Sequence, residues 1–521
     1  MSYKVVIPTA GLGTRLGKIT KYINKSLVSV AHKPIISWQF EKFPNDSEFI
    51  IPIGYKGELV RDYLNLVYPN KKITFVEIEN FQGKNSGLGH TLLKCEDHLQ
   101  HKFLFIACDS LIMEDLPNND NNWIGYSSMK TQDSAYRVVE IEQNKLNKIH
   151  EKGYIQKNNL YPYIGLCQIN DFETFWDKMR KNQDKSILEG ESYGINSMLI
   201  DDIEFSAYAF NWSDTGNLEC LEKIRQKYKD ETDYNILEKE NEHIWFVDEK
   251  VIKFSAEKEF IKNRVKRVNF LKGYVPEIIG SSSNLYLYKL FKGKVFSKIR
   301  DSNKFIDLLA HSKGFWKIHN LDDDKKKIFN SACKKFYRDK SISRIKKFFV
   351  LFNKKDNLDF INGKKVKNLE ILLEKINWDF ISDGLPVRFH GDFHFENILF
   401  KENQFMFVDW RQEFGGNLEY GDLYYDLAKL LHGLIVNHGI INNEEYTVDW
   451  QDNKLSYSIK RIKFLEDCEN LFFEWLDSEK YDSKKVNIIT ALIFLNIAAL
   501  HHYPYCLLLY GLGIEKLNDN I

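Results

Sequence analysis

Short apolar runs alternate with amphipathic stretches over the first 110 residues, and this alternation limits the possible folds more than any other feature. The runs are rich in β-branched and aromatic residues and have the length of strands, whereas the stretches between them have helical spacing. Strict alternation of strand and helix is typical of a doubly wound, mostly parallel α/β sheet. Ligands of such sheets bind beyond the carboxyl ends of the strands, so we expect chemistry in the loops after "VVIP" and "FIAC".

The pattern changes from about residue 240, where a few strands lead into mostly helical sequence. This predicts a second, α+β domain, and we place the two domains at residues 1–232 and 233–521. A chain of 521 residues is longer than one hydrophobic core usually supports, and 43% hydrophobic residues exclude a disordered chain.

Charge and cysteine usage exclude several kinds of partner. Lys+Arg and Asp+Glu both number 73, so no net field favours nucleic acid. The seven cysteines lack the spacing of a disulfide framework or a zinc site, which favours a reducing, cytoplasmic location. The long apolar run near the C-terminus is interrupted by His501, His502 and Pro504 before it reaches the roughly 20 residues of a membrane span. We therefore expect two successive buried helices and no membrane insertion.

A glycine-rich loop follows the first expected strand. In "IPTAGLGTRL", the small residues Ala10, Gly11 and Gly13 allow a tight turn that presents backbone N–H groups to phosphate. Arg15 follows at once and Lys25 ten residues later. Two cations over a polyphosphate suit a displacement at the α-phosphate of a nucleotide, so we assign catalytic roles to both.

The stretch "GLGTRL…NKSLVSVAHKPII" resembles the signature of nucleotidyltransferases that couple a nucleoside triphosphate to a phosphorylated sugar or small alcohol, with release of pyrophosphate. The resemblance covers about residues 1 to 225. It implies that Asp109 in "FLFIACDSL" and Asp214 in "FNWSDTGN" hold the catalytic Mg²⁺. One or two carboxylates, with water and phosphate in the other positions, is the usual protein environment of Mg²⁺.

The same resemblance implies binding residues for the nucleobase and the acceptor. "ENFQGKNSGLGHTLL" is similar to the base-reading segment, with Gln82 and Gly87 at the contact positions. "NKIHEKG" and "YPYIGL" are similar to the segments that bind a sugar phosphate through Glu151, Lys152 and Gly165. Gly153 stands where proline is common, which leaves the acceptor open, and the nucleotide remains CTP, UTP, GTP or dTTP.

A second cluster of polar residues lies in "LPVRFHGDFHFENILF", followed by "FMFVDW". Asp392 near an acceptor hydroxyl, with Asn397 and Asp409 on Mg²⁺, would be the minimum set for phosphoryl transfer. The string resembles small-molecule kinases of the aminoglycoside phosphotransferase and choline kinase family, over about residues 240 to 500. By that resemblance Asp392 is the catalytic base, Asn397 and Asp409 are metal ligands, and Asp426 steadies the catalytic loop.

The two histidines of this cluster could also be interpreted as zinc ligands. His390 and His394 are four residues apart, but Gly391 breaks a helix and the glutamate of the zinc motif is absent. We therefore expect them to form hydrogen bonds with the loop.

An ATP-binding lobe should precede the cluster. "EKVIKFS" offers Lys253 for the phosphates, and the segment that ends near Leu290 resembles the strand that binds adenine. Either Glu257 or Glu259 would pair with Lys253. The stretch before Lys253 lacks the usual glycines, so either a short hairpin replaces them or nucleotide binding is weak.

Together the two sites predict a bifunctional enzyme. ATP would phosphorylate a small hydroxylated metabolite, and the product would be coupled to a second nucleotide, giving an activated sugar for surface polysaccharide. One alternative is a choline or amino-alcohol kinase with a cytidylyltransferase. Another makes the second domain a non-catalytic binding module. The oligomeric state stays open.

Overall fold

The computed structural model describes residues 3–83, 85–117, 120–129, 135–154, 160–228 and 239–521. The chain divides into two compact units. The first comprises Met1–Lys258 with Ile279–Tyr288, and the second comprises Glu259–Ile278 with Lys289–Ile521. The boundary predicted between residues 232 and 233 falls in 229–238, outside the described residues, and stays a prediction.

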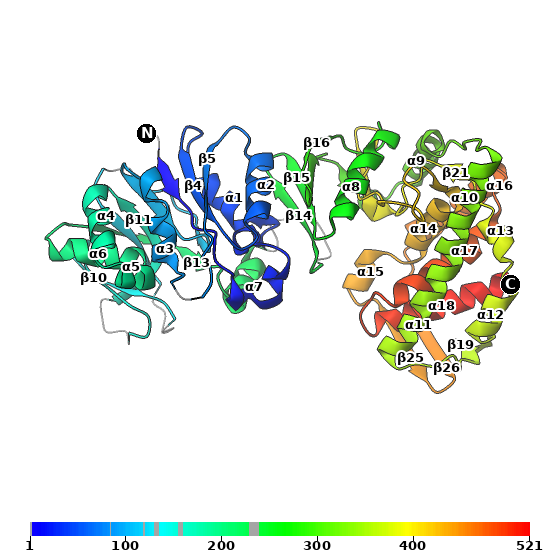
Figure 1. Ribbon diagram of the computed structural model, residues 1–521. Coiled ribbons are helices and arrows are strands. Elements are labelled where there is room, and N and C mark those ends of the chain that lie inside the picture. The colour runs from blue at the N-terminus through cyan, green and yellow to red at the C-terminus, as the bar shows by residue number, and fades with distance from the viewer. Residues whose placement is uncertain (1–2, 84, 118–119, 130–134, 155–159, 229–238) are drawn as a thin grey trace. The chain divides into compact units, whose positions relative to one another are not determined.

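The first unit contains a nine-stranded mixed sheet (Figure 1). Its strands, in sheet order, are β5 (Lys72–Glu77), β4 (Glu48–Ile53), β1 (Lys4–Val6), β6 (Phe103–Ile106), β11 (Leu160–Ile169), β8 (Trp123–Ser127), β12 (Ser206–Phe210), β10 (Lys145–His150) and β9 (Val138–Glu142). The first four are parallel neighbours, whereas β11 is antiparallel to both β6 and β8.

Both faces of this sheet are buried, as in a doubly wound fold. Val5 and Val6 are adjacent in β1 yet belong to different hydrophobic cores. Helices α1 (Ile35–Phe40), α2 (Gly57–Val67) and α7 (Leu218–Lys227) contribute to the first core. Helices α3 (Leu88–Leu93), α4 (Phe172–Lys181) and α6 (Glu191–Ile200) contribute to the second, and α5 (Gln183–Glu189) lies between α4 and α6 in the chain. The predicted α/β architecture is confirmed.

A four-stranded sheet packs within the first unit. Its order is β14 (Glu242–Val247), β15 (Lys250–Ser255), β17 (Leu285–Lys289) and β16 (Ile278–Ser281). Trp245 is fully buried and lies edge-on to Tyr63 of α2, with ring centroids 5.3 Å apart. These strands, which the sequence assigned to the start of the kinase-like domain, thus share the first hydrophobic core.

The second unit is mostly helical. Its helices are α8 (Lys258–Arg267), α9 (Ser302–Phe315), α10 (Asp323–Lys334), α11 (Lys340–Phe352), α12 (Leu369–Lys375), α13 (Trp378–Ser382), α14 (Leu423–Ile435), α15 (His438–Asn442), α16 (Lys463–Ser478), α17 (Ser483–Ala498) and α18 (Tyr505–Asn520). Helix α17 packs against α11, α14 and α18 (Figure 1). The apolar C-terminal run forms α17 and α18, so the prediction of two successive buried helices is confirmed.

Three small sheets complete the second unit. The strands β18 (Lys294–Val295), β22 (Ile398–Lys401) and β23 (Gln404–Phe407) form the first. The second contains β20 (Lys364–Lys365), β19 (Phe360–Ile361), β26 (Lys454–Ile459) and β25 (Tyr446–Gln451), and the third pairs β21 (Pro386–Val387) with β24 (Gly421–Asp422). This combination of helices and small sheets confirms the predicted α+β class.

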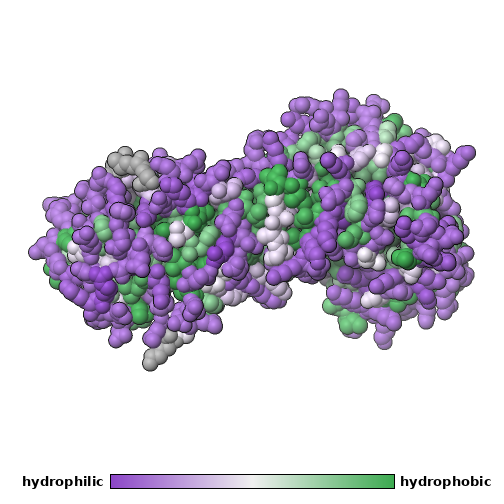
Figure 2. Space-filling model, turned by 45° about the horizontal axis from the view of Figure 1, so that its top comes forward, coloured by the Kyte–Doolittle hydropathy of each residue, from purple (hydrophilic) through white to green (hydrophobic). Residues whose placement is uncertain are grey.

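In the described part of the chain, no helix is both long and apolar enough to cross a membrane. Hydrophilic residues cover most of the face seen in Figure 2.

Candidate active sites

The glycine-rich loop is fixed by a buried asparagine. The side chain of Asn24 donates hydrogen bonds to the carbonyl oxygens of Thr9, at 2.9 Å, and Tyr55, at 2.7 Å. Its oxygen accepts from the N–H of Ser26 at 2.9 Å and so caps the 3₁₀ turn that Lys25 begins. Gly13 has a φ of 68°, a conformation that favours glycine. One side chain thereby positions both the loop and the catalytic-lysine candidate.

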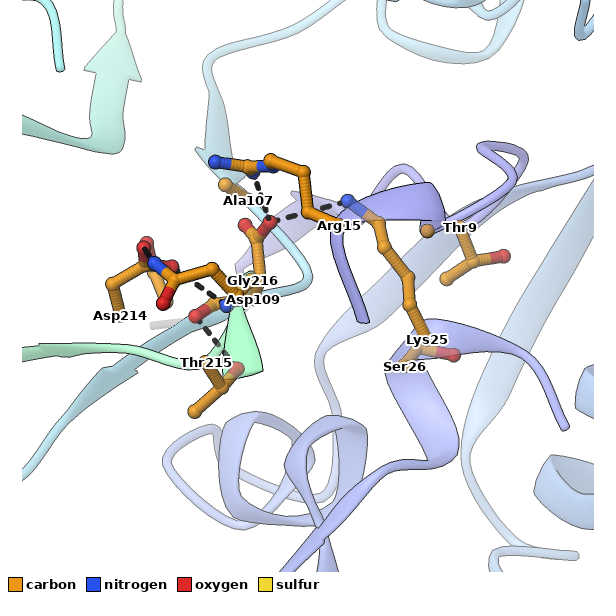
Figure 3. A network of polar contacts seen from close by, with 12 residues as sticks. Thr9, Arg15, Lys25, Ser26, Ala107, Asp109, Asp214, Thr215 and Gly216 are labelled. Atoms are coloured by element: carbon orange, nitrogen blue, oxygen red, sulfur yellow. Dashed lines mark hydrogen bonds and ion pairs between the residues drawn. The ribbon is translucent and has the colours of Figure 1, made fainter. Parts of the chain in front are cut away.

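Lys25 and Arg15 both contact Asp109. The Nζ atom of Lys25 is 3.3 Å from Oδ2 of Asp109, and Nη2 of Arg15 is 3.7 Å from the same oxygen (Figure 3). The side chain of Arg15 is 53% exposed, whereas that of Lys25 is 22% exposed. The prediction that these cations gather at one place agrees with this geometry.

Strand pairing brings the second carboxylate to the same place. Strand β13 (Trp212–Asp214) pairs antiparallel with β7 (Ser110–Ile112), and Asp214 lies opposite Ser110. A Cβ atom on Gly216 would lie 2.7 Å from Oδ2 of Asp109 and 2.9 Å from Oδ1 of Asp214. Both carboxylates therefore face one small space that any side chain at position 216 would fill (Figure 3).

The electrostatics of this space suit a divalent cation. Burial would raise the pKa of Asp109, but the charges of Lys25 and Arg15 outweigh it and lower the pKa. Burial and the charge of Asp109 together raise the pKa of Asp214. Asp214 accepts from the Tyr136 hydroxyl at 2.8 Å and from the Asn217 amide at 3.1 Å. A buried carboxylate supported by neutral donors and facing a second carboxylate fits a Mg²⁺ ligand.

The nucleotide-binding residues predicted in the first unit are either exposed or contact the rest of the protein through their backbone. Gly11 has free space at its Cβ position, and the carbonyl of Ala10 accepts from the N–H of Tyr55 at 3.0 Å. Gln82 is exposed. A Cβ atom on Gly87 would lie 2.6 Å from the carbonyl oxygen of Ile187, so α5 requires a glycine there. The base-contacting role of these residues stays a prediction.

The predicted acceptor residues lie in two places. Glu151 accepts from Nε of Arg137 at 2.9 Å and from the hydroxyl of Ser192 at 2.8 Å, while Lys152 is exposed. Gly165 has a φ of 65° within β11, and its Cβ position lies 2.8 Å from the Cβ of Ala107, two residues before Asp109. Gly165 therefore lets β11 pass close to the strand end that carries Asp109.

The second cluster is organised by the β22–β23 hairpin. Asn397 immediately precedes β22, and its carbonyl accepts from the N–H of Val408 at 2.9 Å just after β23. Asp409 follows in a left-handed conformation with a φ of 61°. This arrangement brings Asn397 and Asp409 together at one end of the hairpin, as the sequence predicted.

Asp392 is held by a lysine and by Asn397. Nζ of Lys429 lies 2.7 Å from Oδ1 of Asp392, and Nδ2 of Asn397 donates to Oδ2 at 3.1 Å. Burial would raise the pKa of Asp392, but Lys429 and His394 hold it well below its usual range. The side chain of Asp392 is 37% exposed, so this carboxylate is both charged and accessible.

Asp426 steadies the loop before Asp392, as predicted. This fully buried carboxylate accepts from the backbone N–H groups of His390, at 2.7 Å, and Gly391, at 2.6 Å, and from the Trp316 indole at 3.1 Å. The ring of His390 accepts from the N–H of Asp392 at 3.2 Å, and its other nitrogen lies 3.0 Å from the carbonyl of Val408. The hydrogen-bonding role expected for His390 is confirmed.

Asp409 has an unexpected partner in α8. Arg264 forms an ion pair with Oδ1 of Asp409, and the arginine is only 8% exposed. Glu259, one of the two glutamates proposed to pair with Lys253, pairs with Lys262 and is 72% exposed. Glu257 precedes α8 and is also exposed. The side chain of this helix that contacts a predicted site residue is thus Arg264, and the pairing of Lys253 with a glutamate stays a prediction.

The remaining predicted ATP residues lie on or beside the four-stranded sheet. Lys253 is buried in β15, and Leu290 directly follows β17. A two-residue turn at Asp248 and Glu249 joins β14 to β15. A short hairpin therefore precedes Lys253, and its role in phosphate binding stays a prediction.

Sequence reasoning missed Lys429, Arg264 and Tyr136. Lys429 follows Asp426 by three residues in "DLAKLL", which puts both on one face of α14, so helical spacing could have identified it. Arg264 and Tyr136 carry no such signal, because their partners are 145 and 78 residues away.

A cavity of the second unit lies apart from the predicted site residues. A cavity of about 950 Å³ in the second unit is lined by Lys266, Lys327 and Lys335 and by Gly415 and Gly416, and it includes none of the predicted site residues. Among the described residues, no group of three or more His, Cys, Asp or Glu side chains could hold a metal. Two protein ligands per site still suit Mg²⁺, which keeps several waters.

Comparison with known proteins relates both parts of the chain to transferases. Residues 358–453 match the model of the "Phosphotransferase enzyme family". The matched segment contains Asp392, Asn397, Asp409, Asp426 and Lys429.

Curated relatives resemble another part of the chain. The chain is 32% identical over 151 residues to "Bifunctional protein GlmU" of Methanococcus vannielii, covering 28% of this chain and 34% of that protein. It is 24% identical over 183 residues to "UTP–glucose-1-phosphate uridylyltransferase AglF" of Haloferax volcanii, covering 35% and 66%. It is 30% identical over 135 residues to "Choline-phosphate cytidylyltransferase" of Streptococcus pneumoniae, covering 25% and 55%.

The chain thus spans about a third of the length of the first of these relatives. It joins a part similar to nucleotidyltransferases to a part that matches a phosphotransferase family, so the predicted fusion is confirmed.

Proposed function

We propose that the protein is a bifunctional kinase and nucleotidyltransferase. The second unit phosphorylates a small hydroxylated metabolite with ATP, and the first couples the product to a nucleoside triphosphate and releases pyrophosphate. The leading acceptor is a sugar, and the activated sugar would serve surface polysaccharide synthesis, such as that of a capsule.

One observation carries this proposal: Asp109 and Asp214 face a single space beside Gly216, and Lys25 and Arg15 contact Asp109 at its edge. Fixed cations beside paired carboxylates provide both the metal ligands and the charge that a phosphate displacement requires. The second unit adds a charged, accessible carboxylate, Asp392, inside the segment that matches the phosphotransferase family.

In the kinase step, an oxygen of the acceptor hydroxyl attacks the γ-phosphorus of ATP. The bond between that phosphorus and the β,γ-bridging oxygen breaks, and ADP leaves. Asp392 receives the hydroxyl proton, while Lys429 and Asn397 hold its carboxylate in place. The products are ADP and a phosphomonoester.

In the nucleotidyl step, a phosphate oxygen of that monoester attacks the α-phosphorus of the second nucleotide. The bond to the α,β-bridging oxygen breaks, and pyrophosphate leaves without any proton transfer. Lys25 and Arg15 neutralise charge on the phosphates, and the loop at Gly11 and Gly13 offers backbone N–H groups. Mg²⁺ bound by Asp109 and Asp214, or by Asn397 and Asp409, would supply further charge neutralisation at each site.

Amino alcohols remain the alternative acceptors. The likeness to a choline-phosphate cytidylyltransferase favours a choline or amino-alcohol kinase that makes a CDP-alcohol. The other alternative is a non-catalytic second domain, which the missing glycines before Lys253 suggest. In the leading proposal the short β14–β15 hairpin takes the role of those glycines.

A product analysis tests the proposal. The full chain is incubated with ATP, Mg²⁺, each of CTP, UTP, GTP and dTTP, and a panel of sugars and amino alcohols, and products are identified by mass. We expect ADP, pyrophosphate and one nucleotide-linked product. Pyrophosphate without ADP, when phosphorylated acceptors are supplied, would favour the binding-module alternative, and neither product would refute the enzyme assignment.

A further inference from the structure

Basic side chains crowd around the kinase base candidate. Besides Lys429, two cations share the ring of Phe336: Nζ of Lys340 lies 4.1 Å from its centroid and the guanidinium carbon of Arg411 lies 5.1 Å from it. A Cβ atom on Gly391 would lie 2.6 Å from the Cβ of Arg411, so Arg411 packs directly against the residue that precedes Asp392. We call Lys340, Arg344, Arg411 and Lys429 the cation cluster.

Negative charge does not balance this cluster. Lys429 pairs with Asp392, but among the ion pairs of the described residues none involves Lys340, Arg344 or Arg411. Arg411 donates from Nε only to a backbone carbonyl, that of Glu413, at 3.1 Å. Of these four cations, Lys429 alone forms an ion pair in the described part of the chain, so the others leave an electrostatic cost uncompensated.

The pKa of Lys340 reflects this excess of positive charge. Burial and then the charges of Arg411, Arg344 and Lys429 lower the pKa of Lys340 to about 6, and Asp392 is the group that opposes them. An anion beside Lys340 would reverse this shift.

The backbone at the cluster is also irregular. A five-residue π-helical segment, Lys335–Asp339, directly precedes α11 and contains Phe336. Lys340 is the first residue of α11. Such π-helical insertions occur frequently at functional sites, where they reposition side chains.

Three histidines lie on another side of Asp392. His394, His432 and His438 line a small cavity, and both ring nitrogens of His432 are buried without a hydrogen-bond partner in the described part of the chain. Burial, with the charge of His394 next, lowers the pKa of His438 to about 4. Burial and Lys429 hold the pKa of His432 well below its usual range.

A neutral imidazole can both donate and accept, which suits a ligand hydroxyl. One carboxylate, Glu396, is among the residues that line this cavity, and its Oε1 lies 3.5 Å from the amide nitrogen of Asn437. Among the described residues, the surroundings of Asp392 thus offer cations and hydroxyl-binding groups rather than the excess of carboxylates that would attract a quaternary ammonium or an amine.

We propose that the alcohol phosphorylated at Asp392 carries a negatively charged group, which the cation cluster binds through Lys340 and Arg411. The acceptor class is then a hydroxy acid or sugar acid rather than choline or another amino alcohol. This inference rests on the proposed kinase function.

The test uses the full chain, ATP, Mg²⁺ and matched alcohols that differ in charge: glycerol, glycerate, glycerol phosphate and ethanolamine, and glucose, glucuronate and glucosamine. ADP formation gives kcat/KM for each. We expect the anionic member of a series to exceed its neutral and cationic analogues at least about tenfold, because one charge-assisted contact is worth that much. Glycerate and glycerol phosphate distinguish a carboxylate from a phosphate.

Variants connect this preference to the cluster. Lys340→Met is expected to raise KM for the anionic acceptor about tenfold while KM for ATP stays unchanged, and Lys340→Arg should retain the preference. Lys347→Met, which removes an exposed charge from the same helix, is the matched control. Pyrophosphate release by the first unit should remain at the wild-type level in all three variants, and an unchanged KM for ATP shows that the second unit is folded.

Two results would overturn the inference while leaving the kinase function in place. One is a preference for the amine, and the other is a rise in KM for ATP alone in Lys340→Met, which would assign the cluster to the triphosphate. Failure to form ADP with any alcohol would refute the proposed kinase function and the inference with it.

Discussion

The carboxylates of the two sites are compensated in opposite ways. In the first unit, Asp214 is contacted by the neutral donors Tyr136 and Asn217 and faces a second carboxylate, Asp109. In the second unit, Asp392 is paired with Lys429 and Asp409 is paired with Arg264. In the first site the cations Lys25 and Arg15 contact Asp109 and leave Asp214 to neutral donors, whereas in the second site Asp392 and Asp409 each pair with a cation.

This difference indicates how each site receives its ligands. Burial and the charge of Asp109 raise the pKa of Asp214, so we expect a divalent cation to bind favourably beside this carboxylate. At the second site Arg264 already pairs with Oδ1 of Asp409, so we expect a metal ion there to compete with this arginine.

The largest expected effect separates the two activities. Asp109→Asn should reduce pyrophosphate release about 10³-fold and leave ADP formation unchanged, whereas Asp392→Asn should do the reverse. Both activities are measured on each variant with a supplied phosphorylated acceptor and with a free alcohol. Asp97→Asn, an exposed carboxylate of the first unit, is the control. Loss of both activities in either folded variant would break the division into two sites.

A smaller effect is expected from the neutral donor at Asp214. Tyr136→Phe removes the hydroxyl that donates to Oδ2 of Asp214 at 2.8 Å. Because partners of this kind orient metal ligands, the Mg²⁺ concentration for half-maximal pyrophosphate release should rise about tenfold. The Mg²⁺ dependence of ADP formation in the same variant is the internal control. An unchanged requirement in both reactions would mean that Asp214 needs no such support.

Arg264→Met should act in the opposite direction at the second site. Removing the cation that holds Asp409 should lower the Mg²⁺ concentration for half-maximal ADP formation several-fold, since the metal no longer competes with an arginine. Lys262→Met, on the same helix and 53% exposed, is the matched control. If the requirement rises instead, Arg264 positions Asp409 for the metal and the contrast between the sites is weaker than the charges indicate.

The smallest effect concerns stability and pH. The pKa of Lys340 is about 6 in the folded protein and about 10.4 in an unfolded chain, so between these values the unfolded chain binds a proton that the folded chain does not. Stability therefore rises with pH across this window. Lys340→Met should unfold at a higher temperature than wild type at pH 7, and the difference should shrink towards pH 10. Thermal unfolding followed by circular dichroism measures both, and a destabilised variant at pH 7 would contradict the prediction.

Much of the site chemistry was predictable because it follows strand ends. Asp109 comes directly after a buried apolar strand, and "HGDFHFEN" with "FVDW" encodes a loop, a hairpin and their polar ends within 20 residues. Local pattern is enough in such cases, since the residues that act together are close in sequence. The packing of β14 to β17 into the first unit could not be predicted in this way, because Trp245 contacts Tyr63, which is far away in the sequence.

The sequence by itself determined which carboxylates, glycines and strands this protein has and in what order, because hydrophobic periodicity and glycine-dependent turns are local properties of the chain. Only the tertiary structure decided which charges oppose those carboxylates. Arg264 reaches Asp409 across 145 residues, and Lys340 and Arg411 meet on the ring of Phe336. Electrostatic interaction depends on distance through space, and packing of the helices sets that distance.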